Sequence, residues 1–178
     1  MLLVGIDPGF ANLGYAKVRH AFGKMTLTEM GVIRTQKSGR KIPASVDNQR
    51  RAGKLYQQLR VALEGADVIC VEAMSFMRNA SAAAKVSLAW GLLVACAEEQ
   101  RLPIVQVSPK DLKLSVAGTA GASKERVAHA LRMLYPSMDG MLHGIPKSRQ
   151  EHPIDALAAI VASLDSEVVR MGVRSESA

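Results

Sequence analysis

The chain has 178 residues, of which 48% are apolar and 4% aromatic. This composition excludes a disordered chain and predicts one domain with a largely aliphatic core. Lys and Arg number 23 against 16 Asp and Glu, a net charge of +7, which favours a polyanionic partner such as nucleic acid.

The first part of the chain predicts strands followed by a helix. An apolar run suggests a strand at 1–7, and alternating apolar and polar residues suggest strands at 12–20 and 24–35, joined by hairpin connections. Residues 35–45 read as a polar, basic loop, and Ser45 is a candidate cap for a helix at 46–63, where leucines recur every four residues.

The rest of the chain alternates strands and helices. We expect strands at 67–72 and 103–108, and helices at 79–99, 110–116, 124–135 (capped by Ser123) and 152–169. Residues 137–150 lack periodicity, and 171–178 suggest a flexible tail. The order predicts an α/β domain over residues 1–170, with helices packed on the faces of a mixed sheet.

Three further features bear on location and redox state. Cys70 and Cys96 lie in apolar runs without metal-ligand spacing, so we expect core residues. We see no signal peptide and no uncharged apolar stretch of membrane-spanning length. A cytoplasmic protein without a membrane partner is the resulting expectation.

Two predicted strands end on an acid. Asp7 precedes Pro8 and Gly9, and Glu72 ends the run DVICVE. If these strands are parallel neighbours, both carboxylates emerge at the ligand-binding edge of the sheet. Mutual repulsion would raise their pKa values, and a hard cation such as Mg²⁺ would relieve it. Alternatively, Asp7 forms an Asp turn and Glu72 a cap.

A third candidate is the run HPID. With Pro153 at the first helical position, His152 would be the N-cap and Asp155 the third helical residue. Residues three apart share a helix face, so both would project from the same helix end. The alternative is a favourable first-turn acid beside an indifferent cap.

Three motifs together resemble one family. GIDPG at 5–9, VEAMSFMRNASAAAKV at 71–86 and HPIDALAAI at 152–160 are similar, in order and approximate spacing, to RuvC Holliday junction resolvases. GIDPG alone also resembles the start of actin-like ATPases. The resemblance implies a ribonuclease H-like fold with a mixed five-stranded sheet flanked by helices on both faces. It also implies a metal-dependent endonuclease that makes paired symmetric nicks with 5′-phosphate and 3′-hydroxyl ends.

The resemblance further implies the site residues. Asp7, Glu72, His152 and Asp155 would be catalytic and would hold two Mg²⁺ ions, with Mn²⁺ as a substitute. His152 stands where many members have Asp, so it is either a metal ligand or a general base. Lys113 and Lys124 match basic residues near the scissile phosphate. Their alternative is ordinary solvated lysine.

DNA and protein partners follow from the same resemblance. The family's base-stacking aromatic aligns with Ser75, so the adjacent Phe76 is the candidate for that role. Asn79, Lys113 and Lys124 are further expected DNA contacts. The positive charge of the chain itself suggests phosphate contacts by six basic residues: Arg34, Lys37, Arg40, Lys41, Arg78 and Lys85. The alternative for the loop at 35–41 is an ordinary solvated surface. Symmetric resolution implies a homodimer, for which helix 79–99 is either the interface or a core helix. A branch-migration helicase is a further partner.

Other functions stay open from the sequence. A related nuclease could act on RNA–DNA hybrids or structured RNA. A non-catalytic binder of branched DNA, or a small ATP-binding module, is the other alternative.

Overall fold

A single mixed sheet organises the chain. The computed structural model describes residues 1–39, 41–74 and 79–175. Its sheet has the strand order β3-β2-β1-β4-β5, in which β1 pairs antiparallel with β2 and parallel with β4. The strands are β1 (Leu2–Asp7), β2 (Asn12–Ala21), β3 (Lys24–Arg34), β4 (Val68–Glu72) and β5 (Ile104–Val107). The predicted mixed five-stranded sheet is confirmed.

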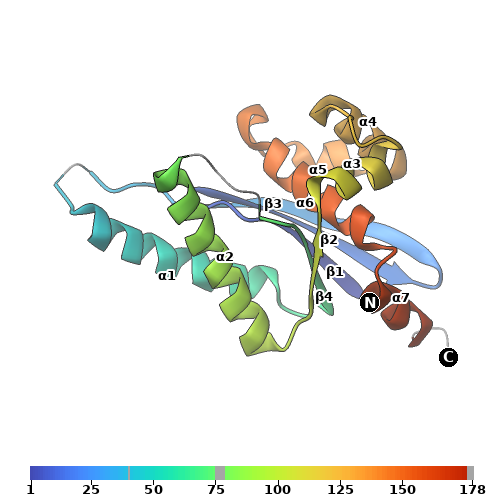
Figure 1. The fold of residues 1–178 in the computed structure, drawn as a ribbon, viewed down its shortest axis with the longest axis horizontal. Helices are drawn as coiled ribbons and strands as arrows, with labels where there is room; N and C mark the ends of the chain where they lie inside the picture. Colours follow the sequence, from blue (N-terminus) through green and yellow to red (C-terminus); the bar gives the residue numbers. More distant parts are fainter. Residues whose placement is uncertain (40, 75–78, 176–178) are drawn as a thin grey trace.

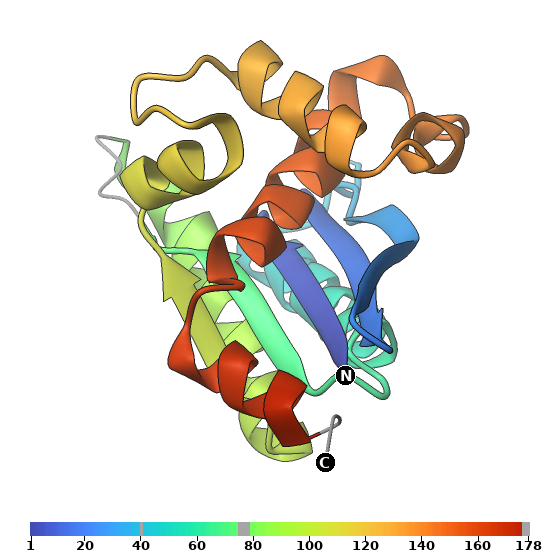
Figure 2. The same ribbon diagram turned by 90° about the vertical axis from the view of Figure 1, so that its right-hand side faces the viewer.

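Helices cover both faces of this sheet (Figures 1 and 2). The long helices α1 (Ala44–Ala62) and α2 (Ala80–Gln100) lie on one face. The opposite face carries α6 (Glu151–Ser163), on which α3 (Pro109–Ala117) and α4 (Lys124–Leu134) pack. The short helix α5 (Met138–Leu142) lies against β3 and α4, and α7 (Glu167–Ser175) follows α6.

The central strands are apolar because both of their faces are buried. Alternate residues enter the two cores, with Leu3 and Cys70 on the α6 side and Val4 and Ile69 on the α1–α2 side. Cys70 and Cys96 are free and buried, which confirms the prediction of core residues.

Two helix boundaries differ from expectation. α1 begins at Ala44 with Pro43 as its N-cap, so Ser45 lies inside the helix and caps nothing. Proline fixes φ near the value needed before a first turn, which lets the helix start earlier. The helix expected at 152–169 breaks after Ser163, since Ser166 accepts a hydrogen bond from the Val169 N–H and starts α7.

Two segments without predicted structure are helical. Residues 137–150 contain α5 and the short 3₁₀ helix η1 (Lys147–Arg149), because Met138 and Leu142 bury their side chains in the α6-side core. The tail expected from residue 171 begins inside α7, which is helical through Ser175. Val169 anchors α7, with 1% of its surface exposed.

Candidate active site

Two of the predicted acids end neighbouring parallel strands. The β1–β4 register places Ile6 beside Val71, and the next residues, Asp7 and Glu72, are the last of their strands. Since Cys70 faces the α6 side, alternation turns Glu72 to that side as well. Both acids therefore stand at the carboxyl edge of the sheet, where α/β proteins bind ligands.

Helix α6 meets this edge at glycines. A Cβ atom on Gly5 would lie 2.0 Å from the Ala156 carbonyl oxygen, and one on Gly14 would lie 2.2 Å from that of His152. Gly14 is also the residue paired with Asp7 in the β1–β2 ladder. The absence of side chains at these positions lets the α6 backbone lie directly on the strands, which brings its first turn beside Asp7.

The start of α6 corrects one expectation. The helix begins at Glu151 after Gln150 as N-cap, so His152 is the second helical residue rather than the cap. Pro153 is tolerated in third place because first-turn N–H groups have no partner within the helix. His152 and Asp155 still share one end of α6, as the spacing predicts.

Asp7 and His152 are in direct contact. His152 Nδ1 lies 2.8 Å from Asp7 Oδ2, and this hydrogen bond raises the pKa of the imidazole despite partial burial. A carboxylate only accepts, so Nδ1 carries the donated proton. Nε2 is then the ring nitrogen left to ligate a cation or to accept a proton.

The other two acids share an electrostatically crowded environment. Burial, followed by the charges of Asp155 and Asp7, raises the pKa of Glu72. Burial also raises the pKa of Asp155, although the Lys124 ammonium opposes the shift. The three carboxyl groups therefore interact across one small region.

Both predicted lysines reach this region. Lys113 on α3 and Lys124 at the start of α4 each act on Glu72 to lower its pKa, although burial outweighs them. Lys124 Nζ lies 3.1 Å from Asp155 Oδ2 and 3.2 Å from Glu151 Oε2. Partial burial opposes the charge on Lys124, but these bonds raise its pKa. Glu151 is a site residue that the sequence did not predict, since its only signal there is an acid directly before HPID.

The donors present fit a hard divalent cation. Three carboxylates and an imidazole are suitable ligands. Burial, with a smaller contribution from neighbouring carboxylates, raises the pKa values of Glu72 and Asp155, and a bound cation would offset both effects. Within the described ranges, no three His, Cys, Asp or Glu side chains are close enough to ligate one ion together. Mg²⁺ commonly uses one or two carboxylates with waters and phosphate oxygens, so a three-ligand group is not required.

Residues 137–150, for which the sequence predicted no structure, border the site. A pocket of about 260 Å³ beside Asp155 is lined in part by Lys124, Lys147 and Gln150. The Gln150 side-chain amide donates to two backbone carbonyls within 137–150, at 2.9 and 3.2 Å, and so holds this wall in place. The segment therefore adds an exposed lysine, Lys147, to the surroundings of the acids.

The structure describes only some of the predicted DNA contacts. Lys85 is half-buried on α2. Asn79 is the N-cap of α2, with its Oδ1 accepting from the Ala82 N–H at 3.0 Å, which gives this side chain a structural role. DNA contacts by both residues stay predictions. Phe76, Arg78 and Arg40 lie outside the described residues.

This sheet order, with acids on two adjacent strand ends and on the helix that crosses them, defines a ribonuclease H-like α/β protein. The sequence model of the family described as Crossover junction endodeoxyribonuclease RuvC matches residues 3–163. The chain belongs to the RuvC family.

Individual relatives cover nearly the whole chain. The crossover junction endodeoxyribonuclease RuvC of Nitratidesulfovibrio vulgaris (strain DP4) is 32% identical, over 92% of this chain and 90% of that one. The enzyme of the same name from Moorella thermoacetica is 31% identical, over 90% and 89% of the two chains.

Solved structures agree with this assignment. Thermus thermophilus RuvC in complex with a Holliday junction substrate superposes with a TM-score of 0.74 and 28% identity, over 97% of both chains. The fowlpox virus Holliday junction resolvase matches at a TM-score of 0.59 and 12% identity, over 93% of this chain and 99% of that one, which supports the fold alone.

Proposed function

We propose that this protein is a metal-dependent, structure-selective endonuclease that resolves Holliday junctions in DNA recombination and repair. The observation that carries the proposal is the convergence of Asp7, Glu72 and Asp155, with His152 bonded to Asp7, at one sheet edge of a RuvC-family chain. Paired symmetric nicks would leave 5′-phosphate and 3′-hydroxyl ends. Such an enzyme would work in the cytoplasm, with a branch-migration helicase as partner.

Asp7, Glu72, Asp155 and His152 are the residues that would hold the metal. Two bound Mg²⁺ ions, or Mn²⁺ in their place, would lower the pKa of an attacking water and stabilise the leaving 3′ oxygen. Asp7 fixes the His152 ring through Nδ1, so that Nε2 is presented in a defined orientation. Lys124 and Lys113 supply positive charge where the scissile phosphate would lie.

The role of His152 can be tested by replacement. We expect His152→Asp to retain substantial cleavage, because a carboxylate supplies a ligand or a proton acceptor at the same position. His152→Ala should lose about a hundredfold or more, the usual contribution of a positioned acid–base group. Single-turnover cleavage of a synthetic junction measures both. Equal rates for both variants and the wild type would remove His152 from the site.

Affinity for DNA would come mainly from phosphate contacts. The net charge of +7 and the exposed Lys37 and Lys41 on the loop before α1 support such a surface. The other described candidates are Arg34, Asn79, Lys85, Lys113 and Lys124. Counterion release would make binding weaken steeply with salt. Branched shape, rather than base edges, would then direct recognition.

Helix α2 supports a homodimer. Among the described residues, it is the one helix that is long and apolar enough to cross a membrane, by length and composition alone. Only 22% of its most apolar stretch is buried, so most of this apolar helix is left accessible to a partner. Ala84, Leu88, Gly91 and Ala95 form an exposed stripe with spacings of four, three and four residues. Such a stripe is typical of a helix that packs against a partner helix. A second copy would bring two sites to the two strands of one junction.

A charge on this stripe should separate the dimer. We expect Leu88→Glu, at a position 37% exposed, to run as a monomer and to lose paired nicking, because the carboxylate would be buried between two apolar helices. Light scattering after size-exclusion chromatography measures the mass. Val61→Glu is the matched control, since Val61 on α1 is 67% exposed and should leave the mass unchanged. A wild-type monomer, or a dimeric Leu88→Glu variant, would exclude this interface.

The function itself is tested by comparing substrates. Labelled four-way DNA junction, RNA–DNA hybrid and linear duplex are incubated with the protein in Mg²⁺ and in Mn²⁺. We expect paired symmetric nicks in the junction and little cleavage of the other two. Preferred cleavage of the hybrid would instead indicate a related nuclease with another substrate. Tight junction binding without nicking in either metal would indicate a binder of branched DNA.

A further inference from the structure

The backbone directly after Asp7 is held by one side chain from another strand end. Residues 8–11 connect β1 to β2, and Thr35 follows the last residue of β3. The Thr35 N–H donates to the Ala11 carbonyl at 3.0 Å, and its hydroxyl donates to the Phe10 carbonyl. Two carbonyls of this short connection are therefore fixed by a single residue.

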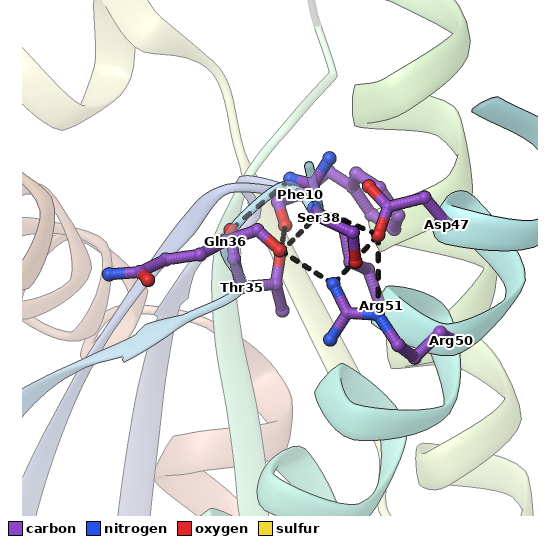
Figure 3. A network of polar contacts seen from close by, with 7 residues as sticks. All are labelled: Phe10, Thr35, Gln36, Ser38, Asp47, Arg50 and Arg51. Atoms are coloured by element: carbon purple, nitrogen blue, oxygen red, sulfur yellow. Dashed lines mark hydrogen bonds and ion pairs between the residues drawn. The ribbon is translucent and has the colours of Figure 1, made fainter. Parts of the chain in front are cut away.

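Thr35 is in turn held by Arg51 of α1 (Figure 3). Arg51 Nε donates to Thr35 Oγ1 at 3.0 Å, and Nη2 donates to the Thr35 carbonyl at 3.3 Å. The guanidinium carbon also lies 4.5 Å from the centre of the Phe10 ring. Arg51 and Phe10 are each 3% exposed and Thr35 is 4% exposed, so water does not compete for these bonds.

The charge of Arg51 has no acidic partner in this cluster. Among the described residues, no carboxylate pairs with Arg51, whereas the neighbouring Arg50 bonds to Asp47 at 2.7 Å and helps to hold the Asp47 pKa at about 2. An unpaired buried guanidinium is unfavourable for stability compared with an apolar side chain of similar volume. Arg51 instead fixes the position of Thr35, because its planar guanidinium bonds to two atoms of that residue at once.

We infer that Arg51 and Thr35 are positioning residues for Asp7: they clamp the connection after β1 and so fix where the Asp7 carboxylate stands. The inference rests on the proposed function, in which Asp7 is a metal ligand. A carboxylate at the end of a strand moves with the backbone that follows it. Releasing Phe10 and Ala11 would therefore displace Asp7 relative to the acids on β4 and α6.

Paired variants test the clamp. Thr35→Val keeps the side-chain shape but removes the hydroxyl, whereas Thr35→Ser keeps the hydroxyl. Arg51→Met keeps most of the volume but removes the donors. We expect Thr35→Val and Arg51→Met to cleave a saturating junction about 10- to 100-fold more slowly, as for other groups that orient metal ligands, with junction affinity within about threefold of wild type. Thr35→Ser should stay close to wild type.

Two readouts do not need cleavage. Isothermal titration with Mn²⁺ alone should show affinity weakened about tenfold in Thr35→Val and Arg51→Met. Hydrogen exchange should be faster in the peptide that covers residues 8–13. If the wild type cleaves no junction, the proposed function fails, while Mn²⁺ affinity and exchange still decide whether the clamp exists.

Two controls separate positioning from general destabilisation. Arg50→Met removes the same kind of side chain one residue earlier. Among the described residues, the Arg50 side chain donates hydrogen bonds to Asp47 and to the Gln36 carbonyl but not to Thr35, so the cleavage rate of this variant should equal that of wild type. Leu59→Ala removes a fully buried side chain of α1 and lowers stability without touching Thr35. The inference is overturned if Thr35→Val and Arg51→Met keep wild-type rates and Mn²⁺ affinity, or if Leu59→Ala reproduces their losses while folded.

Discussion

Asp7→Asn is expected to slow junction cleavage by more than about a hundredfold while junction binding is retained. Asn keeps the size of the side chain and can still accept the hydrogen bond that His152 Nδ1 donates to Asp7 at 2.8 Å. It cannot supply the negative charge that a divalent cation requires. Substituting a residue that only orients a metal ligand lowers metal affinity or activity about 10- to 100-fold. Loss of Asp7, which we propose as a ligand itself, should therefore lower the rate further. Single-turnover kinetics measures the rate.

Binding distinguishes a lost ligand from a lost fold. Junction affinity, measured by fluorescence anisotropy, should stay equal or improve, because the variant removes a negative charge from the surface that we propose binds the DNA phosphates. Glu64→Gln makes the same change of charge at an exposed position after α1, near the amino ends of the parallel strands, and should cleave normally. A fully active Asp7→Asn variant would show that Asp7 lies outside the chemistry.

Much of the sheet was predictable because each strand carries a local signal. Strands β1 and β4 read as apolar runs since both of their faces are buried, and β2 and β3 were marked by hairpin turns. The meeting of Asp7 and Glu72 followed from one assumption, that two runs ending on an acid are parallel neighbours. The register of β1 and β4 bears out that geometry, while the catalytic roles of the acids stay predictions.

The remaining features depend on contacts between distant segments. The residues around Gly14 do not indicate that α6 contacts β2 there. The run HPID likewise does not indicate that His152 bonds to Asp7, 145 positions away. Residues 137–150 lack periodicity because their helices are short, so burial of Met138 and Leu142 could not be read as a stripe. The partners of Lys124 likewise became visible only once α4 and α6 were packed together.

Gly14→Ala is expected to slow cleavage about a hundredfold, although it adds only a single methyl group. Its Cβ would lie 2.2 Å from both the carbonyl carbon and the carbonyl oxygen of His152, and backbone cannot give way as a flexible side chain can. The first turn of α6 would therefore move away from β2 at the position that pairs with Asp7. A shift of about 1 Å between reacting groups can cost about a hundredfold in rate. Cleavage at saturating junction measures the loss.

Stability and a matched glycine complete the test of Gly14. Overpacking should lower the free energy of unfolding by about 1–3 kcal/mol, which thermal denaturation detects and which leaves the variant folded at moderate temperature. Gly53→Ala is the control, because a Cβ there meets nothing within 4 Å and alanine favours a helix interior by about 1 kcal/mol. It should be slightly more stable and fully active. If Gly14→Ala cleaved as fast as Gly53→Ala, the approach of α6 to β2 would not determine the geometry of the site.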